Sequence, residues 1–178
     1  MGGYSLWLRP TSTISKELQT RITRLCSIYN ETSFIPHVTL AGDFDGNLDE
    51  LKEKSRQIAE VCHTQFVIPI KKVDCGITRF QCIYLICEEI PKLIEIGNIS
   101  RSIFGVGQNQ VYFPHLSLLY SKTLSQEIRN EIIESEEANN TINIIKDGIL
   151  MSTIELWDTH SDNEGEWFLV SSYSLSTE

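Results

Sequence analysis

The stretch Pro36-His37-Val38-Thr39-Leu40 returns further along the chain as Pro114-His115-Leu116-Ser117-Leu118. Both read Pro, His, an aliphatic residue, a hydroxyl residue and Leu, and the second His follows the first by 78 residues. Composition alone places a hydroxyl residue two positions after two of the four histidines in roughly 10% of such chains. Requiring Pro before both lowers that chance to on the order of 0.01%. The doubled five-residue pattern is therefore specific.

Strand geometry indicates what the pattern does. Residues i and i+2 of a β-strand point to the same face. His37 therefore projects together with Thr39, and His115 together with Ser117, while the aliphatic residues between them turn toward the core. If the two strands lie side by side about a pseudo-twofold axis, two imidazoles and two hydroxyls meet in one cleft.

Such a cleft suits the hydrolysis of a phosphodiester without a metal. One neutral imidazole removes a proton from water, and the other, as imidazolium, donates a proton to the departing alkoxide. Histidine can play both parts near neutral pH. The two hydroxyls can donate hydrogen bonds to the non-bridging phosphate oxygens as charge develops in the transition state.

Composition limits the partners. The chain has 178 residues, enough for one compact domain over residues 1–178 or for two small lobes that share a core. Lys and Arg total 15 against 24 Asp and Glu, a net charge of −9 that disfavours a long nucleic acid but not a small anion held by local donors. The longest apolar run, residues 82–87, is far too short to span a membrane. With no signal peptide at the start, we expect a cytoplasmic, or alternatively nuclear, protein.

Hydrophobic periodicity predicts mixed secondary structure. Strands are expected at 4–9, 34–40, 65–73, 80–87, 115–120, 141–145, 150–157 and 167–175. Helices are expected at 11–29, after an Asn47 cap, at 91–104 and after a Ser125 cap. Strand–helix–strand–helix–strand thus occurs twice, and the hairpin-like spacing favours an α+β fold. The five cysteines lack metal-binding spacing, so mostly reduced thiols and no metal are expected.

The doubled motif is similar to the paired H-x-[ST] signatures of the 2H phosphoesterase superfamily. Residues 80–85 (FQCIYL) and 114–120 (PHLSLLY) resemble the plant and fungal cyclic phosphodiesterases, a likeness that runs from Tyr4 to about Leu175. The resemblance implies a bilobal α+β fold: two pseudo-symmetric lobes of antiparallel sheet with outer helices and a central cleft. It places both termini in one lobe.

The resemblance also implies the reaction. ADP-ribose 1″,2″-cyclic phosphate would be hydrolysed to ADP-ribose 1″-phosphate after tRNA splicing, and nucleoside 2′,3′-cyclic phosphates would be opened to 2′-phosphates. Neither reaction would need a metal or another cofactor. We expect a monomer that acts on small nucleotides.

Six residues carry over individually. His37, Thr39, His115 and Ser117 match the catalytic quartet, with His115 as the base and His37 as the acid. Trp7 and Tyr120 match positions that line the substrate cleft. Trp7 lies on the polar face of its predicted strand, where a bulky aromatic residue is unexpected. Strict alternation places Tyr120 opposite His115, so Tyr120 needs a strand end or a bulge to reach the cleft.

Other functions stay open at this stage. The same chemistry suits a 2′,5′-oligonucleotide or RNA-end phosphodiesterase, although a longer RNA would need a basic path. A nucleotide-binding module without turnover is opposed by the intact quartet. Residues 158–164 resemble a calcium loop, but Asn163 stands where that loop needs Gly, and Leu169 where it needs Glu. A solvated hairpin turn is predicted there instead.

Overall fold

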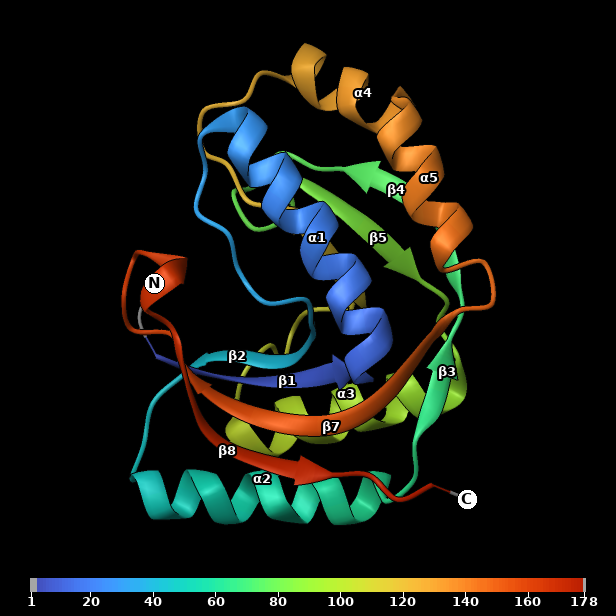
Figure 1. Cartoon of the computed structure of the whole chain (residues 1–178). Helices are drawn as coiled ribbons and strands as arrows, with labels where there is room; N and C mark the ends of the chain where they lie inside the picture. The colour runs from blue at the N-terminus through green and yellow to red at the C-terminus, as the bar shows by residue number, and fades with distance from the viewer. Residues whose placement is uncertain (1–2, 178) are drawn as a thin grey trace.

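The computed structural model describes residues 3–177, apart from the side chains of 136–139. Its strands are β1 (Tyr4–Pro10), β2 (Val38–Phe44), β3 (Phe66–Ile68), β4 (Ile70–Cys75), β5 (Ile83–Cys87), β6 (His115–Leu119), β7 (Ile149–Asp158) and β8 (Phe168–Ser174). Its helices are α1 (Ser12–Tyr29), α2 (Leu48–Cys62), α3 (Pro91–Phe104), α4 (Gln126–Glu134), α5 (Glu136–Ile144) and the 3₁₀ turn η1 (Glu164–Glu166) (Figure 1).

All eight strands belong to one antiparallel sheet. Their order is β3-β7-β1-β2-β6-β5-β4, and β8 pairs with residues 153–158 of β7. The two ends of this order, β3 and β4, are separated in the chain only by Pro69, which lacks the N–H needed to continue the ladder. One segment thus reaches both ends of the sheet, so the sheet curls toward a closed barrel. The antiparallel α+β architecture confirms the fold expected from the sequence.

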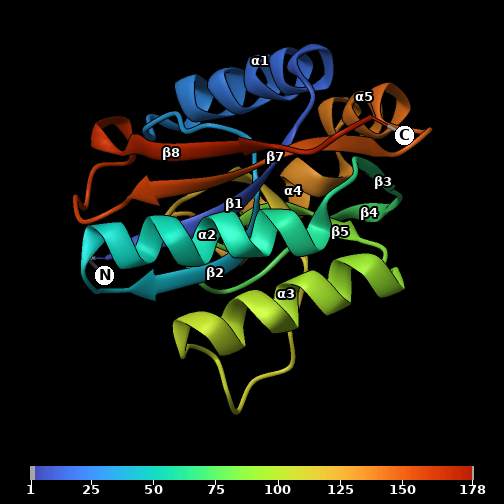
Figure 2. The ribbon, with the colours of Figure 1, turned by 90° about the horizontal axis from the view of Figure 1, so that it is seen from below.

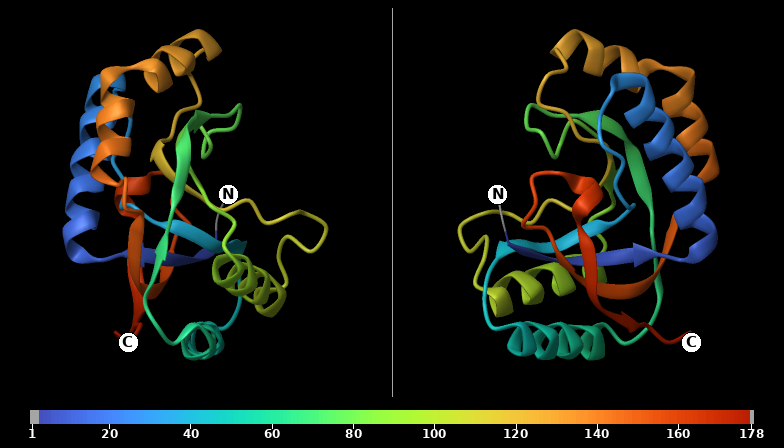
Figure 3. Two further views of the ribbon diagram at one scale, coloured as in Figure 1. Left: turned by 90° about the vertical axis from the view of Figure 1, so that its right-hand side faces the viewer. Right: turned by 60° about the vertical axis from the view of Figure 1, so that its left-hand side comes forward.

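Two lobes make up this sheet. β1, β2, β3, β7 and β8 hold both chain ends, whereas β4, β5 and β6 come from the middle of the chain. α2 and α3 lie side by side against the first lobe (Figure 2). α1, α4 and α5 lie together, away from that pair, and cover the second lobe (Figure 3). Because α1 packs on β6 and α3 packs on β2, each lobe is covered partly by a helix from the other half.

The core runs through both lobes without a break. The aliphatic residues of the two motifs belong to it: Val38, Leu40, Leu116 and Leu118 are each at most 1% exposed. The alternation that turns these residues inward turns the intervening His and hydroxyl residues to the opposite face. Strand periodicity in the two motifs therefore predicts both the core and the site.

One predicted strand was wrong. Residues 141–145 belong mainly to α5, which packs against β4 and α1. Their β-branched residues favour a strand only weakly, because β-propensity depends on the neighbouring surface. Thr141, within α5, and Ile145, in the turn after it, both have buried side chains. Packing against the second lobe determines the outcome.

The segment before β2 also differs from expectation. The ladder starts at Val38 instead of Phe34, because Pro36 has no N–H and the carbonyl oxygens of Ile35 and Pro36 accept hydrogen bonds from side chains. This stretch is extended but unpaired, and it carries His37 to the edge of the ladder.

Within residues 3–177, no helix is long and apolar enough to cross a membrane. All five cysteines are free thiols. Four of them are buried, and Cys75 is half-buried.

Candidate active site

The two motifs meet where the lobes join. Val38 of β2 stands directly opposite Leu116 of β6. Continued by one residue in each direction, this antiparallel register places Thr39 across from His115 and His37 across from Ser117. All four side chains line one cavity of about 670 Å³. The convergence inferred from the sequence is present.

Each histidine is oriented by the same backbone device. His37 Nδ1 lies 2.6 Å from the carbonyl oxygen of Ile35, and His115 Nδ1 lies 2.9 Å from that of Phe113. Because a carbonyl oxygen can only accept, Nδ1 carries the hydrogen in both rings. Nε2 of each neutral ring is therefore the nitrogen without a hydrogen atom, and it can accept a proton.

Burial favours the neutral form of both imidazoles. The pKa of His37 is lowered to about 3, chiefly by burial and in smaller part by the neighbouring Arg9 and His115, whereas the hydrogen bond to Ile35 opposes the shift. Burial also lowers the pKa of His115, by less, and the hydrogen bond to Phe113 opposes that shift. The two histidines share a motif but differ in basicity.

Trp7 packs against His37. The two rings are stacked at 3.7 Å with an interplanar angle of 6°, and Trp157 stacks on Trp7 at 4.6 Å. Nε1 of Trp7 donates to Ser5 Oγ at 2.7 Å, and Trp7 is only 2% exposed. Trp7 thus lines the cavity, where the sequence placed it, but both of its faces are covered by protein. It holds the His37 ring and offers no free face to a base.

A polar network fixes the segment that carries His37. The Arg9 guanidinium donates to the carbonyl oxygen of Pro36 and forms an ion pair with Glu155 at 3.2 Å. Glu155 also accepts from Trp157 Nε1 at 2.8 Å. The Glu155 carboxylate therefore holds Trp157 directly and, through Arg9, the extended segment before His37.

Tyr120 reaches the cavity because β6 ends at Leu119, one residue earlier. The strand end removes the conflict with alternation. Its ring stacks on Phe34 at 3.8 Å, and burial raises the pKa of its hydroxyl, against a hydrogen bond with Ser117. Ser117 Oγ donates to the carbonyl oxygen of Phe80 at 2.8 Å.

Comparison with known proteins agrees with this geometry. The family model described as cyclic phosphodiesterase-like protein matches residues 1–147. The chain belongs to this family. It is 25% identical over 170 residues to the cyclic phosphodiesterase of Arabidopsis thaliana, covering 88% of this chain and 91% of that protein. We therefore describe it as a phosphodiesterase.

Solved structures show the same fold at low identity. LigT of E. coli in its apo form superposes with a TM-score of 0.66 at 14% identity, over 98% of both chains. LigT complexed with phosphate gives a TM-score of 0.65 at 13% identity, again over 98% of both chains. The fold of this cyclic phosphodiesterase-like chain is that of the 2H phosphoesterases.

Two further residues of the phosphodiesterase line the cavity, Arg79 and Trp167. Arg79 is the only Lys or Arg that lines the cavity within the described part of the chain, and it pairs with Glu164 at 2.5 Å. Trp167 lines the same cavity and is half-buried. The sequence offers Arg79 only as one of a few bases, with Arg9 and Lys122, that could form a basic path beside the cleft. Its pairing with Glu164 leaves no local pattern, because the two residues lie 85 positions apart. The expected solvated turn instead buries Glu164.

Among the side chains that the structure describes, residues 3–135 and 140–177, His, Cys, Asp and Glu form no group of three or more that could hold a metal ion.

Proposed function

We propose that this phosphodiesterase hydrolyses ADP-ribose 1″,2″-cyclic phosphate to ADP-ribose 1″-phosphate and opens nucleoside 2′,3′-cyclic phosphates to 2′-phosphates, without a metal. The observation that carries the proposal is the cavity itself. Two His-x-hydroxyl strands lie side by side along it, and each imidazole has Nδ1 engaged and Nε2 left for proton transfer. The named activity of the Arabidopsis relative and the phosphate and 3′-AMP complexes of LigT agree with this substrate class.

His115 is the base in this proposal. Its pKa is lowered less than that of His37, so it is the more basic of the two neutral rings. Its Nε2 takes a proton from water, and the water oxygen attacks phosphorus. In a 2′,3′-cyclic nucleotide the P–O3′ bond then breaks, which leaves the phosphate on O2′.

His37 is the acid, and its Nε2 proton passes to the departing oxygen. Burial favours the neutral form of this ring, so the ring must take up a proton when the substrate binds. The negative charge of the phosphodiester favours the imidazolium form and raises the pKa of His37. A ring whose pKa is otherwise low is a strong acid once it is protonated.

Thr39 and Ser117 stabilise the transition state by donating hydrogen bonds to the non-bridging oxygens. Ser117 must first give up its bond to the carbonyl oxygen of Phe80. The net charge of −9 agrees with a site that relies on hydroxyl donors and a single nearby cation.

The test is turnover of ADP-ribose 1″,2″-cyclic phosphate and of 2′,3′-cyclic AMP with EDTA present, with products resolved by phosphorus NMR. We expect ADP-ribose 1″-phosphate and 2′-AMP at a rate that EDTA does not change. Dependence on an added divalent metal, or a 3′-phosphate product, would contradict the proposal. Cleavage of a 2′,5′-linked oligonucleotide alone would favour the oligonucleotide enzyme, and binding of 2′-AMP without any turnover would favour the binding module.

A further inference from the structure

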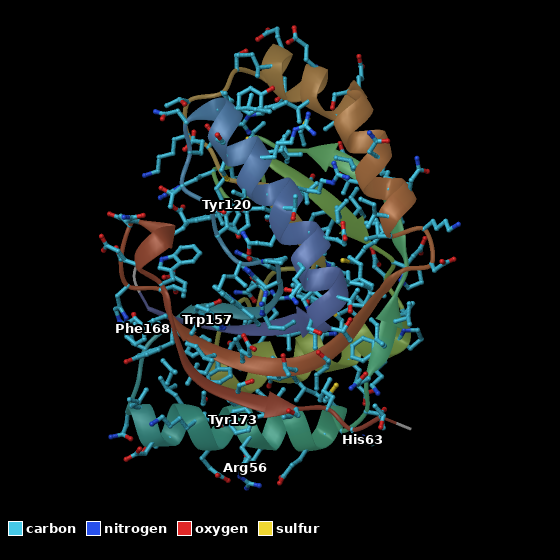
Figure 4. The ribbon with its side chains drawn as sticks, in the orientation of Figure 1. Arg56, His63, Tyr120, Trp157, Phe168 and Tyr173 are labelled. Carbon is cyan, nitrogen blue, oxygen red and sulfur yellow. The ribbon has the colours of Figure 1, made fainter. Side chains whose placement is uncertain are left out.

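A second cavity, of about 300 Å³, lies on the other side of the catalytic cavity's aromatic wall. We call it the rear cavity. The residues that line it include Trp7, Phe34, Trp157, Trp167 and Glu164, and none of the proposed catalytic quartet is among them. Trp7 and Trp167 line both cavities. Trp157 and Tyr120 lie on the side of the molecule where the η1 turn folds back (Figure 4).

The lining of the rear cavity suits a flat heteroaromatic ring. It holds all three tryptophans of the chain. Aromatic side chains bind bases by stacking on their faces. Because both faces of Trp7 are covered, the stacking surface would come from Phe34, Trp157 or Trp167. Binding cavities typically combine such apolar walls with a few placed polar groups. Glu164 supplies such a group, because its side chain is only 4% exposed and each carboxylate oxygen can accept more than one hydrogen bond. An amino group on the ring would find its acceptor there.

Arg79 connects the two cavities. It lines the catalytic cavity and pairs with Glu164, which lines the rear one. Among the described residues that line either cavity, it is the only Lys or Arg. Its hydrogen bonds to Glu164 and to the carbonyl oxygen of Asp162 both come from Nη2, and Nε and Nη1 are its other donor atoms. A guanidinium is well suited to bind phosphate oxygens.

We propose that the rear cavity binds the distal purine of a diphosphate-linked substrate, while Arg79 binds the diphosphate at the junction. The inference rests on the proposed function, because the cyclic phosphate must lie at the two histidines. A cyclic mononucleotide fills only the catalytic cavity, whereas ADP-ribose 1″,2″-cyclic phosphate occupies both. The rear cavity thus selects the extended substrate.

The first test changes the rear cavity and compares two substrates. Ser33 lines the rear cavity but not the catalytic one, so Ser33→Phe places a ring in the proposed purine site. We expect the ratio of kcat/KM for ADP-ribose 1″,2″-cyclic phosphate to kcat/KM for 2′,3′-cyclic AMP to fall about 10-fold, mainly through KM. Ser27→Phe, exposed on α1, is the matched control. An unchanged ratio in Ser33→Phe would overturn the proposal.

Arg79→Met tests the junction. We expect the same ratio to fall about 10-fold, because only the extended substrate carries a diphosphate. Arg56→Met, an exposed arginine on α2, is its control. An equal loss on both substrates would show that Arg79 does not discriminate between them and would overturn its assignment.

A binding measurement separates this inference from the proposed function. ADP-ribose, which has no cyclic phosphate, is titrated while tryptophan fluorescence is followed, since all three tryptophans line the rear cavity. We expect saturable quenching that Ser33→Phe weakens at least 10-fold in Kd and Ser27→Phe does not. Such binding without turnover of either cyclic phosphate would refute the proposed function and leave the rear site. Turnover of both without such binding would refute the rear site alone.

Discussion

His37 and His115 share a five-residue motif and a backbone hydrogen bond, but their surroundings differ. His37 is 5% exposed and stacks on Trp7. The residue before it, Pro36, accepts a hydrogen bond from Arg9. His115 is half-buried beside Phe113, which is itself 39% exposed. The repeated backbone orients the two rings alike, whereas neighbours from other strands set basicity and rigidity. Pseudo-symmetric strands can thus hold an acid and a base.

The largest expected effect is loss of either imidazole. We expect His37→Ala and His115→Ala each to lower kcat/KM for 2′,3′-cyclic AMP by about 100- to 10,000-fold, the contribution of general acid–base catalysis. His63→Ala is the matched control, because its Nδ1 also lies near the carbonyl oxygen two residues back but outside the cavity. Circular dichroism checks folding. A wild-type rate in a folded His37 or His115 variant would show that this histidine is neither the acid nor the base of the reaction.

The hydroxyls come next. Thr39→Val and Ser117→Ala should lower kcat by about 10- to 1000-fold, the range for removing a transition-state donor. We expect the smaller loss at Ser117, because its hydroxyl must break a bond to the carbonyl oxygen of Phe80 before it can donate to phosphate. Steady-state kinetics of both variants decide the order. A larger loss in Ser117→Ala would reverse this part of the comparison.

Much of this arrangement could be predicted from the sequence because it is local. Alternation in the two motifs predicts which residues face the core and which face the cleft, and the strand end after Leu119 is the one local detail that Tyr120 required. The fold class and the family follow from the same residues.

What the sequence could not predict depends on distant contacts. The stack on His37 needs Trp157, which lies 120 residues away in the chain, and the Arg79–Glu164 pair joins the two lobes. The helix at 136–144 forms because its face packs on β4, a surface that local propensity does not contain. Such contacts exist only once the sheet has closed.

An intermediate loss of activity is expected when the aromatic stack that holds the His37 ring is weakened. Trp157 touches Trp7 and Glu155 but no catalytic side chain, so it acts as a positioning residue. We expect Trp157→Leu to lower kcat for 2′,3′-cyclic AMP about 10-fold with little change in KM, and Phe113→Leu to change kcat less than 3-fold. Equal losses in the two variants would show that both histidines depend equally on their aromatic neighbours.

The smallest effect concerns stability. The folded-state pKa of His37, about 3, lies below its ordinary value of 6.5, so between these pH values the unfolded chain binds the proton first. The stability that neutral His37 contributes is therefore complete above pH 6.5 and declines as the pH falls. The free energy of unfolding of the wild type should fall between pH 6.5 and about pH 4.5. We expect this fall, measured by urea unfolding, to be about 1–3 kcal/mol smaller in His37→Gln.

His160 provides the opposite sign. Its hydrogen bond to Asp158, with a second contact to Asp45, raises its pKa, so its contribution is present at low pH and is lost as the pH rises through the folded-state value. His160→Gln should therefore weaken the protein at low pH and leave it unchanged at pH 9. The same slope in both variants would contradict the assignment of a buried neutral ring at His37.

The acid–base pair is tested most directly by the pH dependence of kcat/KM for 2′,3′-cyclic AMP in EDTA. We predict a bell-shaped profile in the wild type, because one imidazole must be neutral and the other protonated, and the apparent pKa values belong to the pair. His37→Ala and His115→Ala should each lose one limb of the bell. A variant that keeps both limbs, or a wild-type rate that does not depend on pH between about 4 and 9, would contradict the account.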